Sequence, residues 1–259
     1  MKQKPSYWIN SVDHALALAV ALHVEGPMSV THAAARLDVA TSTAHRLLSM
    51  LVYRDFAIQD EHRIYHAGPM LSLGPIETEN SAHLRDVALP HLRRLANCVG
   101  ESAFLMILTG AHSRFLASAE ASKPNKIANR DGMILPAHAT SAGLAMLAEL
   151  SPAQLEKLYS PSSLVHLQGQ LPTVSAMSAQ LHLIRERGYA LAAEQAEPGV
   201  TAVGCVLRWP GSQLHCGLSV AAPSSRFHDL DLEASVRALS RTARAIEKDL
   251  TKHSTHLAS

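Results

Sequence analysis

Apolar residues recur at steps of three and four in the first part of the chain, and this spacing predicts three short helices. We expect the first from Asn10 or Ser11 to about Val24, the second from about Val30 to Leu37, and the third from Thr41 or Ser42 to about Arg54. The first would turn inward Val12, Ala15, Leu16, Ala19 and Leu22. Asp38-Val39-Ala40 is a tight connection between the second and third helices, and this order is typical of a helix-turn-helix.

Two short β-prone segments follow the third helix, at Phe56 to Gln59 and Arg63 to His66. The polar stretch between them, Asp60-Glu61-His62, fits a hairpin turn. A hairpin directly after the third helix is the wing of a winged helix-turn-helix. We therefore place a first domain at residues 6–74.

A helical pattern resumes after the polar break at Gly74-Pro75 and runs from Ser81. Pro90 should interrupt it and begin a second helix, because proline disrupts a helix interior but suits a first turn. We read residues 75–89 as a linker helix.

Strand-like and helical segments alternate over residues 90–259, our second domain. Strands are expected at Ser102 to Leu108, Arg114 to Ala119, Tyr189 to Ala193, Val200 to Arg208 and Gln213 to Ala221. Helices are expected at Ser141 to Leu150, Pro152 to Tyr159, Ser175 to Arg187 and Asp229 to Leu250, the last with an apolar stripe that packs on the sheet. We predict an α+β fold with a mostly antiparallel sheet.

The composition supports a folded chain but does not reveal a partner. Of 259 residues 47% are apolar and 17% charged, and 23 Lys and Arg balance 22 Asp and Glu, a net charge of +1. No apolar run suits a membrane span or a signal peptide, so we expect a cytoplasmic protein with no membrane contact. The three cysteines, Cys98, Cys205 and Cys216, lack the spacing of a disulfide framework or zinc site and read as small buried residues.

The third helix carries the clearest chemistry. With its apolar residues inward, Ser42, Thr43, His45 and Arg46 face outward on the first two turns, after Thr41. Hydroxyls and an arginine at this place suit phosphates and base edges of a major groove, and Arg63 on the wing is a further candidate contact. Taken alone, the same residues would be a capping cluster on a solvated face. Residues 1–76 hold six basic and six acidic groups, so binding would rest on a few placed cations, with Lys2 and Lys4 on an N-terminal arm, multiplied by oligomerisation.

Sixteen histidines do not amount to a metal site. His62 and His66 lie four apart on the wing, but no further ligand is fixed beside them by spacing. We expect no metal and no cofactor.

Both halves resemble one family. The segments Ala34-x-x-Leu37, Ser42-Thr43-Ala44-His45-Arg46-Leu47-Leu48 and Tyr65-His66-Ala67-Gly68-Pro69 are similar to the winged helix-turn-helix of the isocitrate-lyase-regulator (IclR) family. Pro136-Ala137-His138-Ala139-Thr140, Ser141-Ala142-Gly143, Arg187-Gly188-Tyr189 and Leu218-Ser219-Val220-Ala221 follow in the family's order. The resemblance covers nearly the whole chain.

The resemblance implies a bacterial transcriptional regulator that binds a double-stranded DNA operator as a homodimer or dimer of dimers. It also implies a GAF-like domain that senses a small metabolite, often an organic or aromatic acid. Carried over by position, the effector pocket would use Leu135, Ser141, Ala142, Val200, Ala202, Ser219 and Ala221. Family dimers associate around the linker helix, so Leu84 and Val87 are candidate dimer contacts.

Three departures from the family pattern matter. Leu144 stands where the family often has lysine, Ala192-Ala193 replace a usual acidic residue, and Asp38 replaces the usual turn glycine. The pocket should therefore have fewer polar anchors and a more apolar ligand. His138, beside the pocket, is either an effector contact or a core residue, and we favour the core.

Two other functions stay open at this point. The second domain could be an enzyme, with Cys205 or Cys216 as nucleophile, but it has no nucleophile elbow, phosphate loop or zincin motif. The winged helix could instead serve a protein-interaction adaptor. We expect a regulator, not an enzyme.

Overall fold

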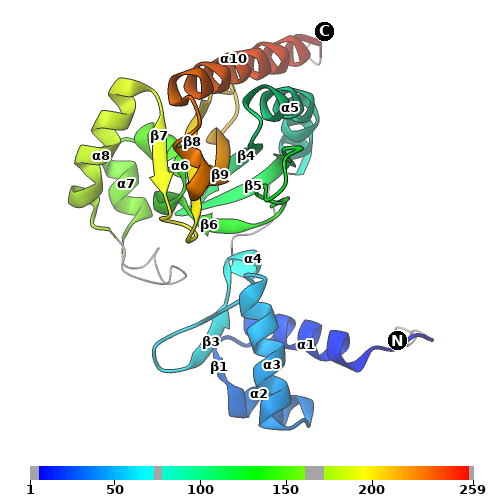
Figure 1. Ribbon diagram of the computed structural model, residues 1–259. Helices are drawn as coiled ribbons and strands as arrows, with labels where there is room; N and C mark the ends of the chain where they lie inside the picture. Colours follow the sequence, from blue (N-terminus) through cyan, green and yellow to red (C-terminus); the bar gives the residue numbers. More distant parts are fainter. Residues whose placement is uncertain (1–5, 73–77, 161–171, 257–259) are drawn as a thin grey trace. The chain divides into compact units, whose positions relative to one another are not determined.

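The chain folds into two compact units, which we describe separately from a computed structural model (Figure 1). The structure describes residues 6–72, 78–160 and 172–256. The first unit ends with residue 72 and the second begins with residue 78 among these residues. The arm lysines Lys2 and Lys4 and the predicted break at Gly74-Pro75 lie outside the described residues.

The first unit is a winged helix-turn-helix, as predicted. Its elements are α1 (Asn10–Val24), β1 (Met28–Ser29), α2 (Val30–Leu37), α3 (Thr41–Tyr53), β2 (Ala57–Gln59), β3 (Ile64–Ala67) and α4 (Pro69–Ser72). The strands form an antiparallel sheet in the order β1-β3-β2. The hairpin β2–β3 is the expected wing, whereas β1 and α4 were not expected.

Local chemistry sets the ends of the two helices of the motif. Ser29 caps α2 through its hydroxyl, which accepts a hydrogen bond from the His32 backbone N–H at 3.2 Å. Asp38 ends α2 in the left-handed region, with φ of +53°, a conformation that Asp tolerates better than most residues. Helix α3 begins at Thr41, as expected, and Ala40 is its N-cap without a side-chain cap hydrogen bond.

The inward face of α1 differs from the prediction. Leu18, Ala19, Ala21 and Leu22 are buried, whereas Val12 and Leu16 are 51% and 60% exposed. Alternating Ala, Leu and Val surround almost the whole helix, so spacing alone does not select a face. Val20 and Val24 extend the exposed apolar face of α1.

The second unit is built on an antiparallel sheet in the order β6-β5-β4-β9-β8-β7. The strands are β4 (Ser102–Thr109), β5 (His112–Ala119), β6 (Ile134–Pro136), β7 (Ala190–Ala193), β8 (Val200–Leu207) and β9 (Cys216–Pro223). The helices are α5 (Thr78–Val99), α6 (Ser141–Ala148), α7 (Pro152–Leu158), α8 (Val174–Arg187), α9 (Ser224–Phe227) and α10 (Leu232–His256), with a 3-10 turn at Ala137–Ala139. The predicted two-domain α+β class is confirmed.

Helices cover both faces of this sheet (Figure 1). Alternate residues of β4 show the division, because Ala103, Leu105 and Ile107 face α5 and α10, while Phe104 and Met106 face the side of α6. The predicted stripe of α10 packs on the sheet through Leu239, Ala243, Ile246 and Leu250. The small helices α7 and α8 pack around α6.

Helix α5 corrects two predictions. It is continuous from Thr78 to Val99 with Pro90 inside it, so no break separates a linker helix from the second domain. Leu84, Ala88 and Leu92 are fully buried against the sheet, and this packing offsets the backbone hydrogen bond that proline cannot make. Leu84 is therefore a core residue rather than a dimer contact, and Val87 is partly buried on the same core.

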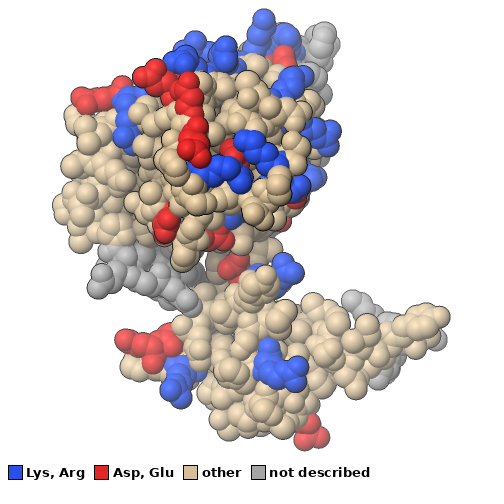
Figure 2. Space-filling view, in the orientation of Figure 1, with Lys and Arg blue, Asp and Glu red and all other residues tan. Residues whose placement is uncertain are grey.

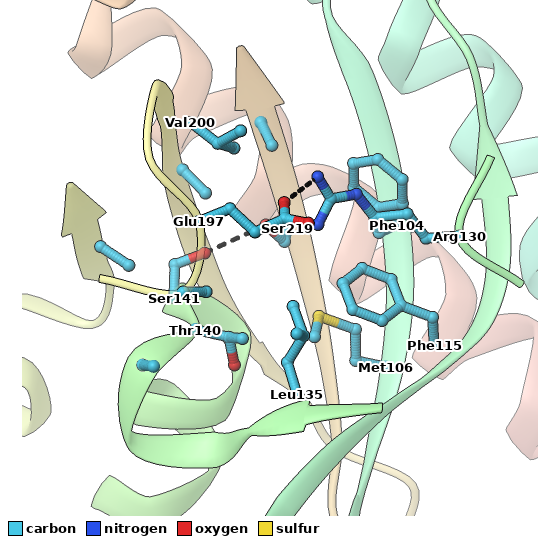
Figure 3. A pocket seen from close by; sticks show the side chains of 15 residues that line it. Phe104, Met106, Phe115, Arg130, Leu135, Thr140, Ser141, Glu197, Val200 and Ser219 are labelled. Carbon is cyan, nitrogen blue, oxygen red and sulfur yellow. Dashed lines mark hydrogen bonds and ion pairs between the residues drawn. The ribbon is translucent and has the colours of Figure 1, made fainter. Parts of the chain in front are cut away.

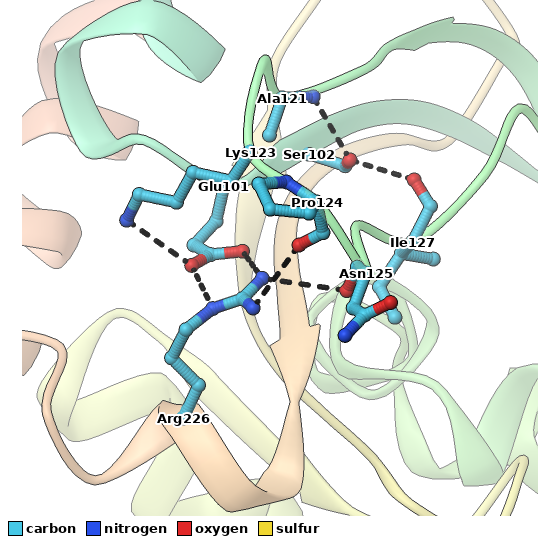
Figure 4. Close-up of polar contacts among 8 residues, drawn as sticks. All are labelled: Glu101, Ser102, Ala121, Lys123, Pro124, Asn125, Ile127 and Arg226. Atoms are coloured by element: carbon cyan, nitrogen blue, oxygen red, sulfur yellow. Dashed lines mark hydrogen bonds and ion pairs between the residues drawn. The ribbon is translucent and has the colours of Figure 1, made fainter.

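The start of β4 holds a buried ion pair (Figure 4). The Glu101 side chain is 1% exposed and receives two hydrogen bonds from Arg226, at 2.8 and 2.9 Å, with Lys123 Nζ at 3.5 Å. Arg226 also donates to the carbonyls of Pro124 and Asn125. These bonds tie α9 to β4 and to the segment after β5.

Two further expectations can be compared with the structure. Cys205 and Cys216 are buried as predicted, but Cys98 is exposed because it lies on the outer face of α5. Across the described ranges, no helix has the length and apolar character needed to cross a membrane.

Candidate functional site

The first two turns of α3 form an exposed polar surface. Thr41, Ser42, Thr43, His45 and Arg46 are all exposed, while Ala44 and Leu48 anchor the opposite side of the helix in the core. Among the described residues, the Arg46 side chain makes no hydrogen bond or ion pair, so its guanidinium is available to a partner. This surface combines helix N-terminal N–H groups, short hydroxyls and one cation, which suit a phosphate backbone and base edges.

The wing is organised by Asp60. Its Oδ1 accepts hydrogen bonds from the backbone N–H groups of His62 and Ile64, at 3.0 and 2.8 Å, and its Oδ2 lies 2.8 Å from His66 Nε2. These bonds, that to His66 first, lower the pKa of the Asp60 carboxyl. Arg63 sits at the tip with φ of +61° and an exposed side chain. The hydrogen bonds to Asp60 therefore fix the backbone of the turn that presents Arg63.

Other cations of the first unit are already engaged. Arg36 pairs with Glu25 at 2.7 Å, and Arg54 lies over the ring of Tyr53 at 5.2 Å. The viewed face of this unit accordingly carries only scattered charged groups (Figure 2). Arg46 and Arg63 remain as its cations without a partner among the described residues.

The second unit encloses a cavity between the sheet, β6 and the start of α6 (Figure 3). Six of the seven residues carried over from the family resemblance line it, namely Leu135, Ser141, Val200, Ala202, Ser219 and Ala221. The seventh, Ala142, is fully buried and is not among the lining residues. Sequence reasoning missed Phe104, Met106, Phe115, Arg130, Ala139, Thr140, Ala192, Ala196 and Glu197.

Hydroxyl groups form part of the lining of the cavity. Ser141 Oγ and Ser219 Oγ lie 3.0 Å apart across the space between α6 and β9, and both residues are buried. The Thr140 hydroxyl caps α6 by accepting from the Gly143 N–H at 3.1 Å. Apolar side chains of β4, β5 and β6 line the middle of the cavity. These hydroxyls offer a few polar contacts to a largely apolar ligand.

The lining also contains a charge pair that the sequence did not predict. Arg130, from the segment before β6, pairs with Glu197, from the loop between β7 and β8. The Arg130 guanidinium also lies over the rings of Phe104 and Phe115, at 6.0 and 5.7 Å. The cavity thus has charged groups that the family resemblance did not suggest. Neither residue lies in a motif, so no spacing in the sequence joins them.

The remaining candidates for chemistry do not converge. Burial raises the thiol pKa of Cys205 and of Cys216 to about 12, which leaves both protonated at neutral pH. His138 is not among the residues lining the cavity; its ring lies 6.1 Å from that of Tyr159, and burial lowers its pKa. Over the described ranges, no three His, Cys, Asp or Glu side chains cluster as a metal site would need.

Comparisons with known proteins agree for both units. The model of the IclR helix-turn-helix domain matches residues 11–61, and that of the bacterial transcriptional regulator IclR C-terminal domain matches residues 77–248. The chain belongs to the IclR family of transcriptional regulators. It is therefore a DNA-binding regulator, and the prediction that it is not an enzyme is confirmed.

Individual relatives span almost the whole chain. The HTH-type transcriptional regulator BhcR of Paracoccus denitrificans is 31% identical over 92% of this chain and 86% of its own length. The IclR crystal structure from Thermotoga maritima has a TM-score of 0.59 at 22% identity, over 93% of this chain and 98% of that one. An IclR homologue from Microbacterium hydrocarbonoxydans, complexed with 4-hydroxybenzoate, has a TM-score of 0.58 at 23% identity, over 93% and 99%. Both structures show a shared fold.

Proposed function

We propose that this IclR-family chain reads a double-stranded DNA operator with the N-terminal half of α3 and that a small acid bound in the second unit changes that reading. The DNA contacts are Thr41, Ser42, Thr43, His45 and Arg46 on α3 and Arg63 on the wing. The effector lies in the cavity lined by Ser141, Ser219 and Arg130.

The exposed Arg46 carries the DNA proposal. It stands on a helix whose opposite face is fixed in the core, so its position relative to the hydroxyls of Ser42 and Thr43 is set by the fold. Arginine can bind guanine or phosphate with two parallel hydrogen bonds, and an arginine without an intramolecular partner does so without first breaking an ion pair. Arg36, by contrast, is paired with Glu25.

The lining of the cavity supports a carboxylate with an apolar body. Phe104, Phe115 and Leu135 suit a hydrocarbon or aromatic ring, and Arg130 suits a carboxylate. The bound 4-hydroxybenzoate of the Microbacterium homologue is a guest of this chemical type. The effector can change DNA binding only if it binds one conformation of the regulator more tightly than another.

We also propose that the regulator acts as a homodimer or a dimer of dimers. Two observations support this. Among the described residues of its first unit, each chain offers only Arg46 and Arg63 as arginines without a partner, so useful affinity requires several copies on one operator. The first unit also leaves an apolar face of α1 uncovered by its own residues, with Val20 61% and Val24 72% exposed.

The test is a mobility shift on the DNA upstream of the gene, with wild type, Arg46→Ala and Arg54→Ala. Arg54 is the matched control, because it lies at the end of α3 away from the hydroxyls and stacks on Tyr53. We expect Arg46→Ala to weaken binding on the order of tenfold or more, corresponding to the loss of about 1–3 kcal/mol from one bidentate contact. Arg54→Ala should bind nearly as wild type. Equal binding by all three chains would contradict the assignment of α3.

A further inference from the structure

The effector cavity already contains a carboxylate, that of Glu197. Of the side chains that line the cavity, Arg130 and Glu197 are the charged ones, and they are paired with each other (Figure 3). The rest of the lining is apolar or carries hydroxyls. The single cation that could anchor an acidic guest is therefore occupied by a group of the protein itself.

Arg130 is the fixed member of this pair. Its backbone N–H donates to Ser118 Oγ at 3.1 Å, and its carbonyl accepts from the Met133 N–H at 2.8 Å. The side chain is 13% exposed and its guanidinium lies over the rings of Phe104 and Phe115, which meet edge to face with centroids 5.4 Å apart. Backbone and side chain together hold the cation at one point of the cavity wall.

Glu197 has fewer ties. It lies in the loop from Glu194 to Gly199, and its side chain is 31% exposed, more than twice the exposure of Arg130. Its carbonyl accepts from the Val200 N–H at 3.3 Å. The loop turns through left-handed residues at both ends, with φ of +55° at Glu194 and +77° at Gly199. Glu197 lies in a loop, is the more exposed partner and has fewer ties, so it is the member of the pair that can move away.

The volume of the cavity also indicates that part of its lining must move when a ligand binds. With Glu197 in place the cavity measures about 40 Å³, which is space for water and not for an aromatic acid. A dry protein cavity that holds benzene measures roughly 150 Å³. A guest of that size must displace part of the lining, and the exposed loop residue is the member that can move outward.

We propose that the Glu197 carboxylate is an internal stand-in for the carboxylate of the effector. The arriving acid displaces Glu197, pairs with Arg130 and places its apolar body beside Phe104, Phe115 and Leu135. Glu197 and its loop then move into solvent, which gives the bound state a different surface. This inference rests on the proposed effector function and adds the internal competitor, Glu197, which the acid must displace from Arg130.

The exchange also explains how the site would select acids. One carboxylate replaces another on the same guanidinium, so the buried cation always has a partner. A neutral amide or alcohol that expelled Glu197 would leave the Arg130 cation without a charged partner in a poorly hydrated site. The Glu197 carboxylate therefore makes the site select acids over neutral molecules.

The experiment uses acetate as the probe, because it is the carboxylate that Glu197→Ala removes. Acetate binding is measured by the rise of the melting temperature and by isotope-filtered NMR of labelled acetate, at constant ionic strength with chloride as the balancing anion. The chains are wild type, Glu197→Ala, Glu197→Ala with Arg130→Met, and Glu149→Ala. The last is the matched control, since it breaks another carboxylate–arginine pair, that of Glu149 with Arg208, outside this cavity. Acetamide serves as the neutral probe.

We expect Glu197→Ala to bind acetate with a dissociation constant on the order of tenfold or more below that of wild type, the value of one charge-assisted pair. Adding Arg130→Met should abolish that binding, Glu149→Ala should behave as wild type, and acetamide should bind to none of the chains. If Glu197→Ala is poorly folded by circular dichroism, Glu197→Gln replaces it, with the same order of affinities and a smaller gain.

Three results would overturn the inference. They are an equal acetate affinity of wild type and Glu197→Ala, acetate binding that survives Arg130→Met, and binding of acetamide as tight as that of acetate.

Failure of the proposed function is a separate result, read in the mobility shift. If acetate binds Glu197→Ala through Arg130 but no acid ever changes DNA binding, the anchor stands and effector control does not. If an acid changes DNA binding equally with and without Arg130, effector control stands and the anchor does not.

Discussion

Substituting Gly204 by alanine should distort the effector cavity through the backbone of α6. Gly204 lies on β8, paired with Ala190 on one side and with Ser219 on the other. A Cβ at this position would stand 2.5 Å from the Ala142 nitrogen, 2.7 Å from the Ser141 carbonyl carbon and 2.9 Å from the Ala142 Cα. All three are backbone atoms, so no side-chain rotation relieves the contact.

The size of the effect follows from these distances. Ordinary contacts of a Cβ begin near 3.4 Å, so the start of α6 must retreat by about 0.9 Å, the difference between 3.4 and 2.5 Å. Every residue of α6 is buried, which opposes such a movement. Overpacking of a core costs about 1–3 kcal/mol, and we expect the upper part of that range here. The retreat should also separate Ser141 from Ser219 and weaken effector binding.

Gly217→Ala is the matched control on the adjacent strand β9. Its Cβ would meet the Ala142 Cβ at 3.1 Å and two carbonyl oxygens at 3.2 Å, so a movement of about 0.3 Å, from 3.1 to 3.4 Å, suffices. We expect a loss below about 1 kcal/mol. Both substitutions add one methyl group beside Ala142, and they differ chiefly in how close the backbone lies.

Urea unfolding followed by fluorescence measures the difference. The chain has two tryptophans, Trp8 in the first unit and Trp209 in the second, so a Trp8→Phe background makes Trp209 the reporter of the unit that contains Gly204. Trp209 packs against the core of that unit. Equal losses for Gly204→Ala and Gly217→Ala, or no loss for Gly204→Ala, would refute the close approach of α6 to β8.

Two other predictions concern the same unit. Arg226→Met should lower the free energy of unfolding much more than Arg208→Met, because the Glu101 partner of Arg226 is 1% exposed whereas the Glu149 partner of Arg208 is 36% exposed. The midpoints of urea unfolding compare the two variants. Equal losses would argue against the buried pair. Iodoacetamide should modify one thiol per native chain, that of Cys98, and all three thiols after denaturation. Burial and a thiol pKa of about 12 keep Cys205 and Cys216 unreactive in the native chain. Rapid labelling of either residue in the native chain, read by peptide mass spectrometry, would contradict their burial.

The elements of the fold were largely predictable because their signals are local. The strand over Ser102 to Leu108 and the helix ending at Gly188 follow from apolar spacing and a left-handed terminator, and the structure places both within a residue or two. Where several local solutions compete, tertiary packing decides. Pro90 looked like a boundary, but the burial of Leu84, Leu92 and Leu95 carries the helix through it.

The effector cavity divides into a predictable and an unpredictable part for the same reason. Ser141 and Ser219 stand in segments that resemble the family, and the structure brings their hydroxyls to 3.0 Å. Arg130 and Glu197 are 67 positions apart, and each lies in an irregular segment with no periodic pattern. Only the sheet order, which puts β5 and β6 at one end and β7 and β8 at the other with α6 between, shows that these two loops can reach across one cavity.

The balance of charges in the first unit is explained in part by contacts that engage two of its arginines. Among its described residues Arg36 is paired with Glu25 and Arg54 stacks on Tyr53, so Arg46 and Arg63 are the arginines left for the proposed DNA contacts. Two such cations in each chain of a dimer would give a slope of log affinity against log salt of roughly −4, about 0.9 for each of four neutralised phosphates. So shallow a salt dependence leaves most of the affinity to base contacts and to the spacing of the two α3 helices. Under the proposed function, effector control would then be effective, because a small change in that spacing removes contacts that bulk charge cannot replace.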